Sequence, residues 1–173
     1  NNDGKLDLVG IGGSKIFVSY NKGDKFENKQ NVVYANKDFL WSCCKLTTER
    51  HYRFLQDMNE DGYPDLVAFR DSDVVVSLWN SKSKKFNIAT KWASDFHKND
   101  GFLKNQGGHI ILKNMNNNDK KGIPEVVAFG RDGFYVAEID NDKKDKFTMA
   151  AYQWGNLSIG FGLRNGKKWR EDI

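Results

Sequence analysis

The sequence has few of the residues that mark several common protein classes. Two prolines among 173 residues are too few for a proline-rich linker. The only cysteines, Cys43 and Cys44, are adjacent and cannot staple distant segments together, so a vicinal disulfide and a pair of thiols both stay open. No run approaches the ~18 uninterrupted apolar residues of a membrane-spanning helix, and we expect no membrane span.

Catalytic signatures are scarce as well. The three histidines, His51, His97 and His109, fall at unmatched positions, and neither a Gly-x-Ser-x-Gly elbow nor a phosphate-binding glycine loop occurs. The sequence therefore predicts a non-catalytic binding protein.

The charge pattern argues against nucleic acid as a partner. The net charge is +4, but the 27 basic residues are mixed with 23 acidic ones, as in residues 140–146. A nucleic-acid-binding domain gathers Lys and Arg on one face, so we expect a solvated, mixed-charge surface and no nucleic-acid partner. A hydrophobic fraction of 39% and an aromatic fraction of 13% predict a folded chain with a core.

Three related segments recur along the chain. Residues 57–69 read Asp-Met-Asn-Glu-Asp-Gly-Tyr-Pro-Asp-Leu-Val-Ala-Phe, and residues 114–129 form a looser copy with three extra loop residues. Joining residues 172–173 to residues 1–9 gives a third copy, so the copies start 57 or 58 residues apart. We expect one segment, 1–173, of three repeats: 172–173 plus 1–56, 57–113, and 114–171.

The pattern within each repeat is that of β-structure. Short apolar runs separated by turn residues indicate hairpins, with a first run after each acidic loop, a second run after a tight turn, and a Phe that predicts the start of a third strand. The first runs are 8–11, 66–69 and 126–129, the second runs are 16–20, 74–79 and 134–137, and the phenylalanines are Phe26, Phe86 and Phe147.

The fold class expected from this spacing is an all-β propeller with blades of four antiparallel strands, three of them in this chain. A single blade cannot bury both faces of its sheet, and propellers typically have four to eight blades. The three blades are therefore expected to belong to a larger ring. The missing blades could come from a longer chain or from a second copy, and a second copy would make six.

The loop 57–65 carries the clearest chemical signal. Oxygen-bearing side chains stand at Asp57, Asn59, Asp61 and Asp65, the carbonyl of Tyr63 would supply a further oxygen, and Gly62 permits a sharp bend. Hard oxygen ligands suit Ca²⁺. An EF-hand would need Glu at the twelfth position, which is Ala68, so the loop predicts a structural calcium site of a β type.

The other two loops are variants of this pattern. The split loop would use Asp172, Asn1, Asp3, the Lys5 carbonyl and Asp7. The third loop offers Asn114, Asn116, Asn118 and Glu125, where amides replace carboxylates. Loss of negative charge predicts weak or no calcium binding there, with Asp119 as a partial substitute. The alternative for all three loops is an Asx-rich turn without metal.

The motif resembles the FG-GAP or VCBS repeat of integrin-type propellers and, more closely, the repeats of the Psathyrella velutina lectin-like propeller family. The segments that carry this resemblance are His51-Tyr-Arg-Phe-Leu-Gln-Asp57 and Ala128-Phe-Gly-Arg-Asp-Gly-Phe-Tyr-Val-Ala137. It implies a seven-bladed, calcium-containing lectin that binds glycans or glycoproteins, of N-acetylglucosamine or sialic-acid type, between blades. Secretion or an extracellular location is the accompanying expectation.

Candidate sugar-binding residues combine an aromatic face with polar neighbours. They are Asp38, Trp41, Asp95, His97, Asn99, Trp154 and Asn156. The alternative is that the tryptophans pack between blades. A second functional hypothesis is an integrin-like scaffold for protein–protein interaction or adhesion.

Overall fold

The computed structural model describes just under two-thirds of the chain. The described residues are 1–13, 15–28, 31–34, 39, 51–94, 96, 102, 107–114, 124–130, 133–139 and 147–155. They contain thirteen β-strands and no α-helix, which confirms the predicted all-β class. None of them forms a helix long and apolar enough to cross a membrane.

Three antiparallel sheets and one small ribbon account for all the strands. The first sheet has the order β1 (Leu8–Ile11), β2 (Ile16–Ser19), β3 (Asn31–Tyr34). The middle sheet has the order β4 (Tyr52–Gln56), β5 (Asp65–Phe69), β6 (Val74–Ser77), β9 (Thr90–Ala93). The third sheet has the order β10 (His109–Lys113), β11 (Glu125–Gly130), β12 (Gly133–Ile139), β13 (Phe147–Gly155). The ribbon pairs β7 (Trp79–Asn80) with β8 (Lys85–Phe86).

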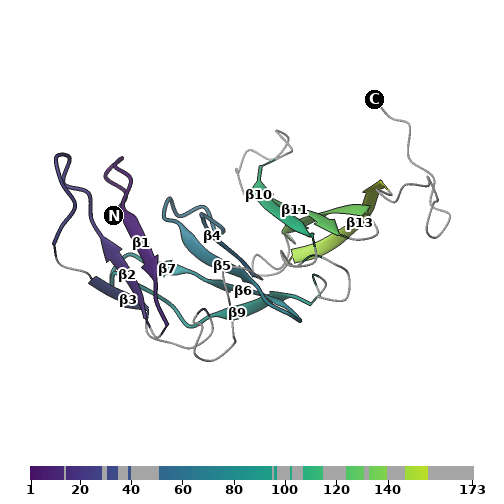
Figure 1. The fold of residues 1–173 in the computed structure, drawn as a ribbon, viewed down its shortest axis with the longest axis horizontal. Helices are drawn as coiled ribbons and strands as arrows, with labels where there is room; N and C mark the ends of the chain where they lie inside the picture. The colour runs from purple at the N-terminus through teal and green to yellow at the C-terminus, as the bar shows by residue number, and fades with distance from the viewer. Residues whose placement is uncertain are drawn as a thin grey trace.

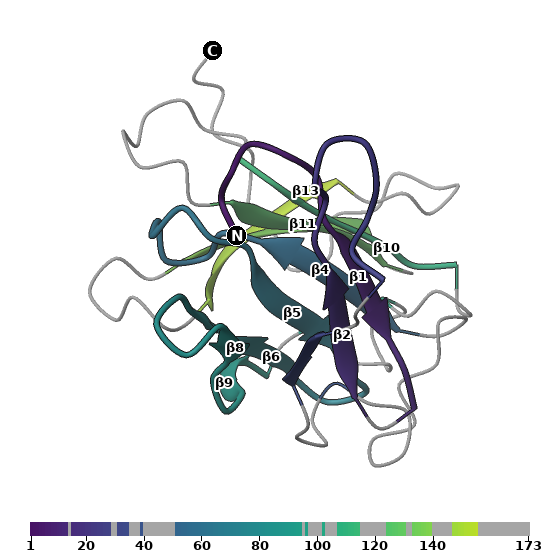
Figure 2. The ribbon, with the colours of Figure 1, turned by 90° about the vertical axis from the view of Figure 1, so that its left-hand side faces the viewer.

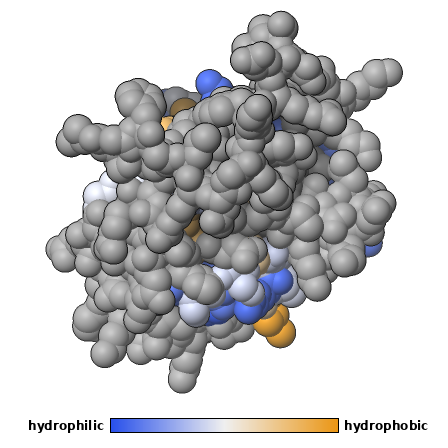
Figure 3. Space-filling view, turned by 90° about the vertical axis from the view of Figure 1, so that its right-hand side faces the viewer, coloured by the Kyte–Doolittle hydropathy of each residue, from blue (hydrophilic) through white to orange (hydrophobic). Residues whose placement is uncertain are grey.

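The sheets are stacked in chain order. Figure 1 shows them fanned out from the first sheet to the third, with the middle sheet between them. In Figure 2, β1 and β2 lie in front of β5, and β11 and β13 lie behind it. From the third-sheet end, the described part of the surface is largely hydrophilic with a small hydrophobic patch at its lower edge (Figure 3).

Strand alternation gives each sheet two distinct faces. We call the face of a sheet that is directed toward the preceding sheet its leading face and the opposite one its trailing face. The leading face of the middle sheet carries Leu66, Ala68 and Val75, which pack against the first sheet in one hydrophobic cluster. Its trailing face carries Val67, Phe69, Val74 and Val76, which pack against the third sheet in a second cluster. Because both faces are covered, all five residues of β5 are buried. The hydrophobic core therefore lies in the two spaces between the three sheets.

The sheets are one strand out of phase with the sequence repeats. β4 precedes the loop 57–64 yet pairs with β5 in full register, from Tyr52 opposite Phe69 to Gln56 opposite Asp65. β10 pairs with β11 in the same way across the next loop. The repeat 57–113 thus supplies three strands to the middle sheet and one to the third. Two sheets of four antiparallel strands agree with the predicted strand number.

The prediction that a third strand starts at each phenylalanine is correct only at Phe147. Phe86 ends the short ribbon strand β8, and Phe26 forms an isolated bridge with Asn21. The outer strands β3 and β9 start later, at Asn31 and Thr90.

A serine hydroxyl is hydrogen-bonded to the backbone at each of the two places where the outer strand starts late. The hydroxyl of Ser77 donates a hydrogen bond to the Asn87 carbonyl, and that of Ser19 donates one to the Glu27 carbonyl. Each hydroxyl thus occupies a backbone carbonyl of the segment that runs back along the sheet. In the third sheet Ala137 stands at this register position and offers no hydroxyl, and β12 and β13 are longer there.

Candidate functional site

The loop 57–65 joins β4 to β5 and is organised by its own carboxylates and amide. Asp57 Oδ1 accepts hydrogen bonds from the Glu60 amide at 2.7 Å and the Asn59 amide at 3.3 Å, and Asp57 Oδ2 accepts from the Gly62 amide at 2.9 Å. Asp61 Oδ1 accepts from the Tyr63 amide at 2.9 Å. The side-chain oxygens of Asp57, Asn59 and Asp61 are therefore hydrogen-bonded to the backbone of the loop itself.

Two left-handed residues make this turn possible. Gly62 has φ of 83°, a conformation that side chains rarely adopt, and Glu60 has φ of 64°. A Cβ on Gly62 would lie 3.3 Å from Asn2 Nδ2, so the first loop closely approaches this one. The predicted role of Gly62 in bending the chain is thus seen directly.

Asp65 anchors the end of the loop inside the protein. Its side chain is fully buried; Oδ2 accepts from the Met58 amide at 2.9 Å and Oδ1 from the Trp79 amide at 2.7 Å. Burial raises the pKa of Asp65 to about 6, with a further increase from the Asp61 and Asp57 carboxylates, against the lowering effect of the two amides. A positive charge near this carboxylate would therefore be strongly favoured.

The raised pKa of Asp65 predicts a pH dependence of stability in metal-free protein. The folded-state pKa of about 6 exceeds the ordinary value of 3.8, so the folded chain binds this proton more tightly than the unfolded chain. The stability gained from the proton is complete below about pH 3.8 and is lost as the pH rises through about 6. Chemical denaturation in chelator across this range should show the decrease, and D65N should remove it.

The donor set of the loop fits calcium in its chemistry. All the candidate ligands are oxygens, supplied by Asp57, Asn59, Asp61 and Asp65 side chains and the Tyr63 carbonyl. In the described part of the chain, no three His, Cys, Asp or Glu side chains are grouped closely enough to hold a metal ion. The loop carboxylates accept backbone amides instead, so calcium stays a prediction here.

The first loop repeats the same anchoring. Asp7 Oδ1 accepts from the Asn21 amide at 2.9 Å, as Asp65 does from Trp79, and Asp3 Oδ1 accepts from the Lys5 amide at 3.0 Å. That amide hydrogen bond is the main reason why the pKa of Asp3 is lowered. Asn1 Nδ2 donates to Asp3 Oδ2 at 2.9 Å. The fifth predicted ligand, Asp172, lies outside the described residues.

The third loop is described only at its two ends. Glu125 is buried, and Asn114 has a buried Oδ1 with no hydrogen-bond partner. Asn116, Asn118 and Asp119 lie outside the described residues.

Most of the predicted sugar-binding residues also fall outside the described part. These are Asp38, Trp41, Asp95, His97, Asn99 and Asn156. The backbone of Trp154 lies in β13. Cys43 and Cys44 lie outside as well.

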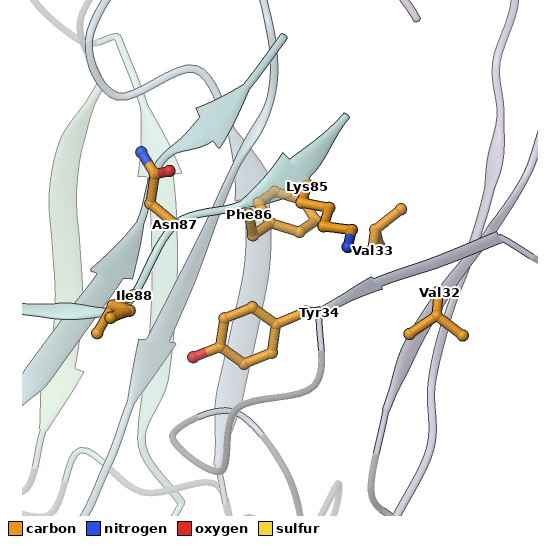
Figure 4. Close-up of a pocket in the computed structure, with 7 residues that line it drawn as sticks. All are labelled: Val32, Val33, Tyr34, Lys85, Phe86, Asn87 and Ile88. Atoms are coloured by element: carbon orange, nitrogen blue, oxygen red, sulfur yellow. The ribbon is translucent and has the colours of Figure 1, made fainter. Parts of the chain in front are cut away.

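A groove between the first sheet and the β7–β8 ribbon could not be predicted from the sequence. It has a volume of about 140 Å³ and is formed where β3 meets the β8 segment (Figure 4). Its lining residues are Val32, Val33, Tyr34, Lys85, Phe86, Asn87 and Ile88.

The groove combines apolar walls with polar groups. Tyr34 and Phe86 supply aromatic rings, and Phe86 is held edge-on against Trp79 with 4.9 Å between ring centroids. Ile88 is 76% exposed, and the side chains of Asn87 and Lys85 are also exposed. Such a surface offers an apolar patch for C–H groups and hydrogen-bond donors for hydroxyl or carbonyl oxygens. The repeat pattern identifies Phe86 from the sequence, but its neighbour Tyr34 comes from another repeat.

One solved structure similar to this chain is a lectin from Agrocybe aegerita, described for its specific recognition of non-reducing terminal N-acetylglucosamine. It shares 26% sequence identity with a TM-score of 0.69, over 86% of this chain and 35% of the lectin. The chain thus spans about a third of that lectin's length. The Tc holotoxin pore of Photorhabdus luminescens matches in fold alone, at 15% identity and a TM-score of 0.51, over 83% of this chain and 6% of the toxin chain. No protein-family model and no curated protein sequence matches.

Proposed function

We propose that this chain is a calcium-stabilised lectin segment that binds glycans without catalysis, and that its three sheets are blades of a β-propeller. The observation that carries the proposal is its similarity over most of its length to a lectin that recognises terminal N-acetylglucosamine. N-acetylglucosamine-terminated glycans are therefore the ligand class to test first, with sialic-acid-terminated glycans second. Glycoproteins and an extracellular setting belong to the same proposal.

The inter-sheet groove is the proposed contact surface for the sugar. Phe86 and Ile88 would meet the apolar face of a pyranose ring, while the Asn87 amide would bond a polar substituent. Tyr34 lines the groove but is only 4% exposed, so it would support this surface from the core. Ile88 is 76% exposed, which supports this role because its side chain is available for contact with a ligand. Sugar binding would then depend on two neighbouring sheets holding their spacing.

Substitution of Ile88 by aspartate is expected to weaken glycan binding at least ~10-fold, the equivalent of roughly 1.4 kcal/mol. The cause is loss of an apolar contact and introduction of a charge that must be desolvated. The measurement is calorimetric titration with an N-acetylglucosamine-terminated oligosaccharide in calcium buffer.

The matched control is L55D, since Leu55 is 41% exposed and lies on β4 at the opposite edge of the middle sheet. L55D should bind as the wild type does. Equal binding by I88D would remove the groove from the proposal. Failure of the wild-type chain to bind any glycan on an array would refute the lectin function itself.

Calcium is proposed as the structural partner of the loop 57–65. Bound Ca²⁺ would neutralise the carboxylates that the loop gathers. In the absence of an ion, Asp57 and Asp61 disfavour the ionised form of Asp65. The loop residues that bind the ion would hold the loop closed and thereby fix the position of Asp65, where β5 begins.

Removal of calcium by a chelator is expected to lower the melting temperature by about 5–10 °C, on the basis of roughly 2.7 kcal/mol of linkage at an ion concentration 100 times Kd. D61A should abolish this calcium response, whereas D24A, at an exposed aspartate outside the loop, should retain it. A wild-type melting curve that chelator does not move would rule out the calcium assignment.

A further inference from the structure

The segment that lines the groove after β8 is held by its backbone. Asn87 lies between β8 and β9. The hydroxyl of Ser77 donates a hydrogen bond to the Asn87 carbonyl, and the Asn87 amide donates one to the Leu78 carbonyl at 2.8 Å. Ser77 is fully buried, whereas Asn87 is exposed and lines the groove (Figure 4). Both backbone groups of Asn87 are therefore fixed by the end of β6, and its side chain is available at the groove.

The next residue of the chain positions the aromatic wall of the groove. Trp79 pairs with Phe86 in the β7–β8 ribbon, and the two rings lie edge-on with 4.9 Å between their centroids. The Trp79 amide donates a hydrogen bond to the buried Asp65 carboxylate at 2.7 Å. Three consecutive residues, 77–79, thus contact the two groove residues Phe86 and Asn87. This short stretch is itself anchored in the core.

The first sheet contains the same arrangement of hydrogen bonds away from the groove. Ser19 stands at the register position of Ser77. Its hydroxyl donates to the Glu27 carbonyl at 2.7 Å, and the Glu27 amide donates to the Tyr20 carbonyl at 2.9 Å. The Glu27 carboxylate forms an ion pair with Lys22 at 2.7 Å. The described residues thus hold two copies of one arrangement, and the copy with Ser77 borders the groove.

We propose that Ser77 is a positioning residue for glycan binding: through the Asn87 backbone it orders the segment 86–88 before a ligand arrives. The inference rests on the proposed function of the groove. A surface segment that must be ordered during binding reduces the affinity, whereas a segment that is already held does not. Because Ser77 is fully buried, it would act without touching the sugar.

Hydrogen exchange of backbone amides, measured by NMR without glycan, tests the positioning itself. S77A should make the Asn87 amide exchange about 5-fold faster, the effect of losing one typical hydrogen bond that holds the segment closed. The Glu27 amide should keep its wild-type rate in S77A. S19A is the matched control and should give the reverse, with faster exchange at Glu27 and no change at Asn87. Faster exchange at both residues in S77A would show a general loss of stability and would overturn a local role.

Calorimetric titration with an N-acetylglucosamine-terminated oligosaccharide in calcium buffer tests the consequence for binding. S77A should weaken binding about 5-fold, because the segment must then be ordered by the ligand, and S19A should bind as the wild type does. Equal weakening by S77A and S19A would overturn the inference, since the same lost hydrogen bond would then act through overall stability.

Two further outcomes separate this inference from the proposed function. Unchanged affinity of S77A, in a chain whose wild type binds the oligosaccharide, would overturn the positioning role and leave glycan binding intact. Absence of binding by the wild type would overturn the proposed function, and the positioning role with it, whatever the exchange rates are.

Discussion

Replacement of Phe69 by alanine is expected to lower the free energy of unfolding by about 3–5 kcal/mol, the range for large-to-small changes at fully buried aromatic positions. Phe69 is 0% exposed on the trailing face of the middle sheet. Its ring packs edge-on against Phe54 and Phe96, with centroid distances of 5.9 and 5.5 Å. Truncation would leave a cavity between two sheets, and urea denaturation measures the loss.

The control for Phe69→Ala is Phe26→Ala, since Phe26 is 40% exposed in the connection between β2 and β3. This change should cost less than about 1 kcal/mol. A loss of similar size for both variants would contradict the packing of the middle sheet against the third as described.

Replacement of Asp65 by alanine is expected to destabilise the calcium-loaded protein by about 2–5 kcal/mol at pH 7. The carboxylate accepts the amides of Met58 and Trp79, and each buried amide left without a partner costs roughly 1–3 kcal/mol. Loss of a proposed calcium ligand adds to this. Thermal melts in calcium and in chelator would measure both contributions.

The loss in D65A should be smaller in chelator than in calcium. Without an ion, the buried carboxylate is itself unfavourable when charged, as its pKa of about 6 indicates, and its removal partly offsets the lost hydrogen bonds. The control is D24A, which changes an exposed side chain. Equal losses for D65A in both buffers would argue that Asp65 anchors the loop without taking part in ion binding.

The central hairpins could be predicted from the sequence because their signals are local. The apolar runs around Leu66 and Val74 are bounded by an acidic loop and a tight turn, and the structure has strands there within one or two residues. The bend at Gly62 is local for the same reason. Repetition of the pattern strengthened each prediction, since one repeat unit implies the others.

The phase of the sheets and the groove could not be predicted in this way. The pairing of β4 with β5 reaches across the loop 57–64, so the repeat that begins at Asp57 does not coincide with one sheet. The groove requires β3 to lie beside the segment after β8, and this contact depends on how two sheets pack. Neither arrangement is encoded in a single stretch of sequence.

The proposed function and the fold depend on the same packing. The carboxylates of Asp7 and Asp65 each accept a hydrogen bond from a backbone amide that follows the second strand of the hairpin. The donor is Asn21 for Asp7 and Trp79 for Asp65. Trp79 in turn holds Phe86 at the groove. The loop 57–65 is thereby linked to the proposed sugar-binding surface through one hydrogen bond and one aromatic contact.

The most direct measurement is an NMR titration of the isotope-labelled chain with an N-acetylglucosamine-terminated oligosaccharide in calcium buffer. Saturable shifts of Phe86, Asn87 and Ile88 resonances, with little change at Leu55 on the far edge, are the predicted result. A spectrum that stays unchanged up to millimolar glycan would contradict glycan binding by this chain.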